Sequence, residues 1–175
     1  MLGKIEAARF AREKKIPYLG ICLGMQIAVI EYARNVLGLG TANSTEFNEK
    51  TEHPVVIYMP EISKEVKGGT MRLGLQTTTI TDPSSLASDV YYGAKEVNER
   101  HRHRYEVNTK YLDALEKEGM VFTGHDTKNE RMEICELKKE MGHPFFLGVQ
   151  FHPEFLTKPM QPSPPFLHFV EATRK

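Results

Sequence analysis

The chain has 175 residues, a mass of 20.0 kDa, and 23 basic and 23 acidic side chains. This length predicts one compact domain, and the neutral balance gives no overall field to attract a nucleic acid or an anionic membrane. With 40% hydrophobic and 26% charged residues, a disordered chain is excluded. No apolar run approaches the roughly 20 residues of a membrane span and no leader opens the chain, so we expect a soluble, cytoplasmic protein.

Helical and extended patterns alternate along the first half of the chain. Apolar residues at helical spacing predict helices, and short apolar runs bounded by turn residues predict strands. The run that ends at Cys22 is typical of a strand buried on both faces. The expected elements are helices at residues 3–14 and 23–37 and strands at residues 17–22, 54–58 and 73–80.

The second half continues the alternation. Thr109 is a plausible cap for a helix, and proline suits the first turn of the last helix. The expected elements are an extended segment at 97–107, a helix at 109–118, strands at 120–123, 132–137 and 145–151, and a helix from Pro164 or Pro165. Helices interleaved with buried strands predict a three-layer α/β/α domain, with a mainly parallel central sheet and an antiparallel extension.

The strongest local signal is the pentapeptide Gly-Ile-Cys-Leu-Gly at residues 20–24. It has the form of a nucleophile elbow, in which small residues flank the reactive one because a sharp strand-to-helix turn leaves no room for side chains. A cysteine at a helix N-terminus is favoured as thiolate, and the N–H of Leu23 would face an oxyanion. The alternative is that Cys22 is a small buried hydrophobic residue that ends a strand.

A second signal places a histidine and a carboxylate after a buried strand. His152 ends the run and Glu154 follows two positions later. A thiol nucleophile needs a base to take its proton and return it to a leaving amine, and a carboxylate can orient that imidazole. His152 alone would more simply be a structural histidine. Together with Cys22 it predicts a Cys22-His152-Glu154 triad.

These motifs resemble the class I, triad-type glutamine amidotransferases. More narrowly, several segments resemble the glutaminase domain of CTP synthases, over a stretch from about Gly3 to the last helix. They are residues 43–47 (Asn-Ser-Thr-Glu-Phe), 68–74 (Gly-Gly-Thr-Met-Arg-Leu-Gly), 99–108 (Glu-Arg-His-Arg-His-Arg-Tyr-Glu-Val-Asn) and 163–166 (Ser-Pro-Pro-Phe).

The resemblance implies hydrolysis of L-glutamine to glutamate and ammonia through a Cys22 thioester. By position, Gln26, Glu46 and Arg104 match residues that hold glutamine in the family, and Tyr105 lies beside them. A guanidinium can fork onto the α-carboxylate, while a glutamate can accept from the α-ammonium. Leu23 would supply one oxyanion N–H.

The resemblance also implies partners for the whole enzyme. Ammonia would pass to an amidoligase (synthase) domain that converts UTP to CTP with ATP and Mg, stimulated by GTP, and the full-length enzyme would be a homo-oligomer. The glutaminase domain itself is expected to need no cofactor.

Family domains begin with further strands and a Pro-Gly-Gly turn that donates a second oxyanion N–H. Residues 1–175 are therefore expected to be a glutaminase domain without its first strands and that turn.

Two other interpretations remain open. The chain could be a catalytically incompetent glutaminase-like assembly module, or a hydrolase of the γ-glutamyl peptidase type. His101 and His103 share one face of a strand and could offer two imidazoles to a metal, but without a paired Cys or His motif we predict no metal site. The basic segment around them is too local to predict nucleic-acid binding.

Cys135 alternates with charged residues and is expected to face the core as a structural residue.

Overall fold

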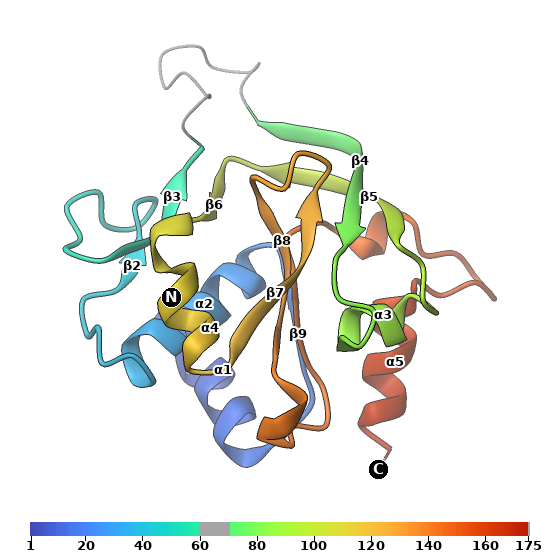
Figure 1. Ribbon diagram of the computed structural model, residues 1–175, viewed down its shortest axis with the longest axis horizontal. Coiled ribbons are helices and arrows are strands. Elements are labelled where there is room, and N and C mark those ends of the chain that lie inside the picture. Colours follow the sequence, from blue (N-terminus) through green and yellow to red (C-terminus); the bar gives the residue numbers. More distant parts are fainter. Residues whose placement is uncertain (60–70, 175) are drawn as a thin grey trace.

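A computed structural model describes residues 1–59 and 71–174 (Figure 1). The segment 68–70, part of one motif above, lies outside them. The helices are α1 (Leu2–Lys14), α2 (Leu23–Asn35), α3 (Leu86–Val90), α4 (Leu112–Lys117) and α5 (Pro164–Ala172), with short 3-10 turns at Thr109–Tyr111, Lys139–Met141 and Pro153–Phe155. The strands are β1 (Tyr18–Ile21), β2 (Asn43–Ser44), β3 (Pro54–Tyr58), β4 (Arg72–Ile80), β5 (Glu96–His103), β6 (Tyr105–Val107), β7 (Met120–Asp126), β8 (Met132–Leu137) and β9 (Phe146–Val149).

The strands form two sheets. The larger has the order β1-β9-β8-β7-β4-β5, and the smaller has the order β2-β3-β6. In the larger sheet β1 and β9 are parallel, whereas the other neighbouring pairs are antiparallel. The predicted α/β class is confirmed, but the expectation of a mainly parallel sheet is wrong for the described residues. The physical reason is the length of the connections. Parallel neighbours need a long crossover, whereas a short turn joins antiparallel neighbours. Short segments connect β7 to β8 and β8 to β9, so these strands run antiparallel.

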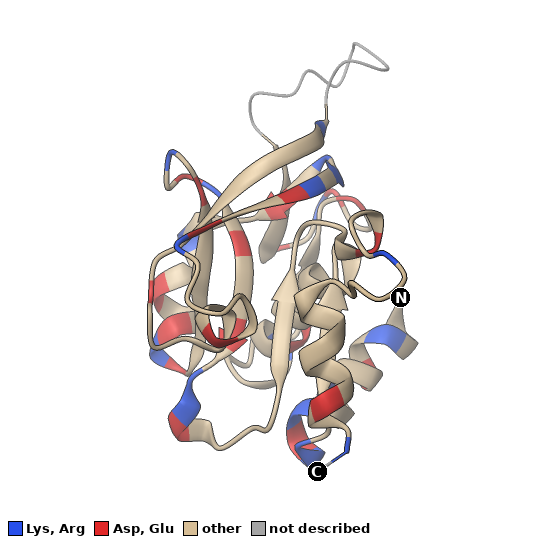
Figure 2. Cartoon of the chain, turned by 90° about the vertical axis from the view of Figure 1, so that its right-hand side faces the viewer, with Lys and Arg blue, Asp and Glu red and all other residues tan. Residues whose placement is uncertain are grey.

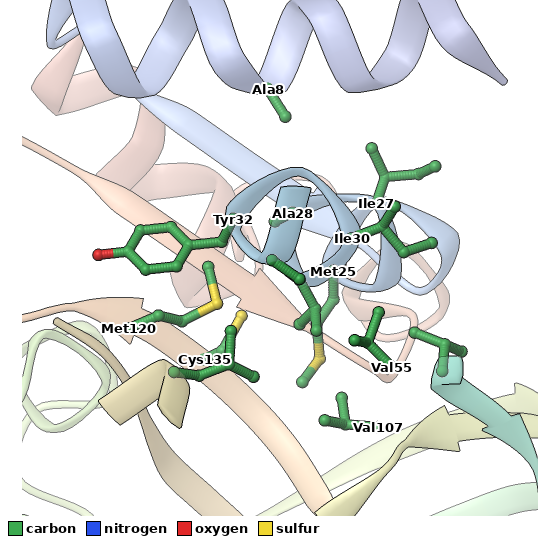
Figure 3. Packing of buried hydrophobic residues seen from close by; sticks show 14 of the residues in the cluster. Ala8, Met25, Ile27, Ala28, Ile30, Tyr32, Val55, Val107, Met120 and Cys135 are labelled. Atoms are coloured by element: carbon green, nitrogen blue, oxygen red, sulfur yellow. The ribbon is translucent and has the colours of Figure 1, made fainter. Parts of the chain in front are cut away.

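Helices cover both faces of the larger sheet, as the predicted three layers require (Figure 1). One apolar cluster lies under α1, α2 and α4, and Figure 3 shows how Met25 and Tyr32 of α2 meet Met120 and Cys135 of the sheet. The second cluster lies under α3 and α5. Cys135 is fully buried, which confirms its assignment to the core.

Several boundaries differ from the sequence-based expectation. The extended segment 97–107 breaks at Arg104, where the chain passes from the larger sheet to the smaller one. The helix near residue 109 is capped by the side chain of Asn108, which accepts from the N–H of Lys110, rather than by Thr109. Helix α3 was not predicted, since five residues are too few to show a helical period.

Both signs of charge are distributed over the surface. In the view of Figure 2, basic and acidic residues are scattered over several elements, and neither sign is confined to one region of the cartoon. Such a surface fits the neutral overall balance. Among residues 1–59 and 71–174, no helix is both long and apolar enough to cross a membrane.

Candidate active site

The elbow at Cys22 has the geometry that its sequence predicts. Cys22 lies between β1 and α2 and has φ 51° and ψ −103°, a conformation that a residue with a side chain adopts only at a cost. A Cβ added to Gly20 would lie 2.7 Å from the backbone carbon of Gly24. The two backbones touch where the strand turns into the helix, so residue 20 must be glycine.

Parallel pairing brings the second signal to the same end of the sheet. Ile21 of β1 lies opposite Val149 of β9, and the N–H of Cys22 donates to the carbonyl of Val149 at 2.7 Å. Because parallel strands end at the same edge, His152 emerges beside the elbow. The N–H of His152 also donates to the carbonyl of Arg100 on β5, at 2.8 Å, which fixes its backbone.

His152 and Glu154 form the predicted pair. The distance from His152 Nδ1 to Glu154 Oε1 is 2.6 Å, and the histidine side chain is 20% exposed. With Nδ1 engaged by the carboxylate, Nε2 is the nitrogen that remains for proton exchange. Within the described residues no hydrogen bond joins Cys22 to His152, so the link between thiol and base depends on their positions at neighbouring strand ends.

The protonation of Cys22 differs from the expectation. Burial raises the pKa of its thiol above the ordinary value, and this outweighs the lowering by the N–H of Leu23 and the side-chain amide of Gln150. The carboxylates of Glu154 and Glu46 raise it further. The helix N-terminus therefore does not by itself produce a thiolate, and the nucleophile needs a base such as His152.

A pocket opens in front of the elbow. Its volume is about 360 Å³, and it contains both cationic and anionic groups. It brings together the elbow, the loop after β2 and the junction of β5 with β6. The lining residues predicted from the sequence are Cys22, Leu23, Gln26, Glu46, Arg104 and Tyr105, and the structure adds Met71, Arg102 and His103. His152 and Glu154 are not part of this lining.

Comparison with known proteins shows the family of the chain. Residues 1–172 match the family described as glutamine amidotransferase class-I. The chain belongs to the class-I glutamine amidotransferases. It is 58% identical over 170 residues to the CTP synthase of Rubrobacter xylanophilus and 52% identical over 171 residues to CTP synthase 1 of Homo sapiens. Those alignments cover 97% and 98% of this chain but only 30% and 28% of the relatives, so the chain spans less than a third of their length.

A solved structure is similar over the same range. It is described as the glutaminase domain of Trypanosoma brucei CTPS with bound acivicin. The TM-score is 0.90 at 44% identity, and the match covers 98% of this chain and 65% of that one. The α/β architecture is therefore that of a class-I glutamine amidotransferase domain.

Sequence reasoning missed one residue of this candidate site. Gln150 is fully buried, and its amide lies between Gln26 and Cys22. The signal was available, because a long polar side chain stood at the end of a buried strand, between Val149 and Phe151. Buried polar groups need partners, so such a residue points to a hydrogen-bonded site.

The two histidines of the amidotransferase domain's basic segment are buried side by side. His101 Nδ1 lies 3.1 Å from His103 Nε2, and His103 Nδ1 lies 2.9 Å from the carbonyl of Tyr105. Burial lowers the pKa of His101 to about 2 and that of His103 to about 4, so both are neutral at pH 7. Both ring nitrogens of His103 are hydrogen-bonded, whereas His101 Nε2 has no hydrogen-bond partner among the described residues and lies 3.8 Å from Glu133 Oε1. No group of three or more potential metal ligands occurs among residues 1–59 and 71–174.

Proposed function

We propose that this chain hydrolyses L-glutamine to glutamate and ammonia, as the glutaminase part of a CTP synthase. The observation that carries the proposal is the placement of Cys22 on an elbow at the sheet edge where the His152–Glu154 pair emerges, with a charged pocket in front. The relatives named CTP synthase support the narrower assignment.

The proposed reaction has two acyl-transfer steps, in which Cys22, His152 and Glu154 act together. His152 Nε2 takes the thiol proton, and the sulfur of Cys22 attacks the carbon of the side-chain amide. The oxyanion is met by the N–H of Leu23, and His152 returns the proton to the departing nitrogen, so that ammonia leaves and a thioester remains. Water, deprotonated by His152, then attacks the thioester carbon, so that the C–S bond breaks, glutamate leaves, and His152 returns the proton to the sulfur of Cys22. Glu154 holds the imidazole in the tautomer that both steps need.

The pocket contains groups that complement a free amino acid. The guanidinium of Arg104 can bind the α-carboxylate in a fork, and the carboxylate of Glu46 can accept from the α-ammonium. Gln26 uses its NH₂ group on Tyr105 and Gln150, so its carbonyl oxygen is the part left for substrate. This complementarity fits the free α-carboxylate and α-ammonium of a glutamyl group, which glutamine and a γ-glutamyl peptide share.

The wider assignment concerns the whole enzyme. The ammonia would be used by an amidoligase domain that converts UTP to CTP with ATP and Mg, under stimulation by GTP, in a cytoplasmic homo-oligomer. No step assigned to the chain's own residues requires a cofactor. The chain corresponds to less than a third of its CTP synthase relatives, which leaves room for that domain in the same enzyme.

Covalent labelling tests the glutaminase proposal. The chain is incubated with acivicin, a glutamine analogue, and its intact mass is measured with and without excess L-glutamine. We expect one adduct that maps to Cys22, is suppressed by glutamine and is absent from Cys22→Ala. The matched control is Cys135→Ala, which removes the buried cysteine and should leave labelling unchanged. A folded chain that forms no glutamine-protected adduct would contradict the proposal.

A further inference from the structure

Gln150 is held in place by its backbone and by its side chain. It directly follows β9, its backbone N–H donates to the carbonyl of Glu133 at 2.8 Å, and no part of it is exposed. Its Oε1 accepts from Gln26 Nε2 at 3.1 Å, and its own Nε2 lies 3.6 Å from the sulfur of Cys22. The buried amide therefore reaches the reacting atom of the proposed nucleophile.

The backbone carbonyl of Tyr105 fixes which end of that amide faces the sulfur. A carbonyl oxygen can only accept, so the group of Gln26 that lies 3.1 Å from it must be the NH₂. The second hydrogen of this NH₂ points to Gln150, which must therefore present its oxygen there and its own NH₂ to Cys22. Reversing either amide would oppose two donors or two acceptors.

We propose that Gln150 is a further functional residue of this site, whose amide N–H donates to the Cys22 sulfur, orients it, and stabilises the thiolate formed when His152 takes the proton. Its role in turnover rests on the proposed glutaminase function, but the bond to sulfur does not. In the step concerned the S–H bond breaks, the proton moves to His152 Nε2 and the electron pair stays on sulfur. There it meets two N–H groups, those of Leu23 and Gln150.

The donor matters because the elbow is otherwise unfavourable for a charge. Burial and the carboxylates of Glu154 and Glu46 all raise the pKa of Cys22, whereas Leu23 and Gln150 lower it. A hydrogen bond to a charged acceptor is stronger than one to a neutral acceptor, so the Gln150 donor favours the thiolate over the thiol. Removing it should raise the thiol pKa, and the thiolate that forms at higher pH should be at least as nucleophilic, because thiolate nucleophilicity rises with pKa.

The test follows alkylation of Cys22 by iodoacetamide as a function of pH, in the 175-residue chain. Peptide mass spectrometry separates Cys22 from the buried Cys135. Gln150→Met removes the donor at nearly constant volume, and Gln161→Met makes the same exchange at an exposed position and serves as the matched control. We expect Gln150→Met to raise the apparent pKa, lowering the alkylation rate at neutral pH by about tenfold, while the rate at the high-pH plateau does not fall. Gln161→Met should match the unchanged chain.

Gln150→Glu decides the outcome if the methionine variant does not fold, because it keeps the side-chain shape and the acceptor for Gln26. Its carboxylate would oppose the thiolate, so the apparent pKa should again rise. Identical pH profiles for the unchanged chain and a folded Gln150 variant would overturn the proposal. Acivicin labelling separates this failure from failure of the glutaminase function: a normal adduct with unshifted profiles refutes only the donor role, whereas a shifted profile with no adduct refutes only the function.

Discussion

The glycines that flank Cys22 are equivalent in the sequence but not in the structure. Gly20 lies against the backbone of Gly24, so a Cβ there would overlap atoms that cannot move independently. A Cβ on Gly24 would meet only the hydroxyl of Tyr18, at 3.9 Å, which is an ordinary contact. The elbow motif thus contains one glycine required by close approach and one that the turn does not require.

Alanine substitutions at the two glycines should therefore have different effects. Gly20→Ala is expected to lower the free energy of unfolding by about 1–3 kcal/mol and to reduce acivicin labelling, because overpacking would displace the elbow. Gly24→Ala at the start of α2 is expected to be neutral or to stabilise by up to about 1 kcal/mol, because alanine is the better helix former. Urea unfolding and Cys22 labelling check both. Equal losses in the two variants would contradict this distinction.

At the residue scale, the sequence predicts the reactive groups better than their environment. Cys22, His152 and Glu154 lie in short local motifs, so the residue types and their spacing in the sequence are enough to identify them as candidates. The role of Gln150 depends on Gln26 and Tyr105, which come from distant segments that only the fold joins. The same holds for the pKa of Cys22, since burial is a property of the packed site.

At the scale of elements, β5 is built around the buried histidine pair. His101 and His103 point to one side of the strand, whereas Arg102 between them is exposed and lines the pocket. Because side chains of a strand alternate between its two faces, the sequence predicts that the histidines and Arg102 face opposite sides. It does not predict that the buried histidines hydrogen-bond to each other. An isolated strand shows which face a residue is on, and only the neighbouring elements decide what it meets there.

Burial of His103 predicts that stability falls in acid. Its pKa is lowered from 6.5 to about 4 in the folded chain, first by desolvation. Above pH 6.5 both states are neutral at this residue, and the stability is fully present. As the pH falls from 6.5 to about 4, the unfolded chain takes up a proton that the folded chain excludes, so stability is lost, by up to about 3 kcal/mol. His101 acts in the same direction.

His103→Asn tests this linkage. Asparagine retains a donor that can reach the carbonyl of Tyr105 but does not titrate. Urea unfolding of both chains at pH 8 gives the fixed cost of the substitution, and the same measurement at pH 5 gives the acid effect. We expect the unchanged chain to lose more stability between these values than the variant does. Parallel losses would show that His103 does not contribute to the acid sensitivity.

At the scale of the whole molecule, β8 and β9 connect the two apolar clusters. Ile134 and Leu147 belong to the cluster under α3 and α5, while their neighbours Cys135 and Phe146 belong to the cluster under α1 and α2. The sequence predicts the three layers from these buried runs. It does not predict that Glu136 is buried as well, because its partners, the N–H groups that begin α3, lie some fifty positions away in the chain.

Because the same strands contribute to both clusters, neither cluster can open without disturbing the other, and we expect the described domain to unfold cooperatively. Cys135 reports this, since it is fully buried at the centre of β8 and burial raises its thiol pKa to about 12. In a Cys22→Ala chain it is the remaining thiol. Its alkylation by iodoacetamide along a urea series should coincide with the loss of the circular dichroism signal. Alkylation at lower urea, with the secondary structure intact, would show instead that the cluster under α1 and α2 opens on its own.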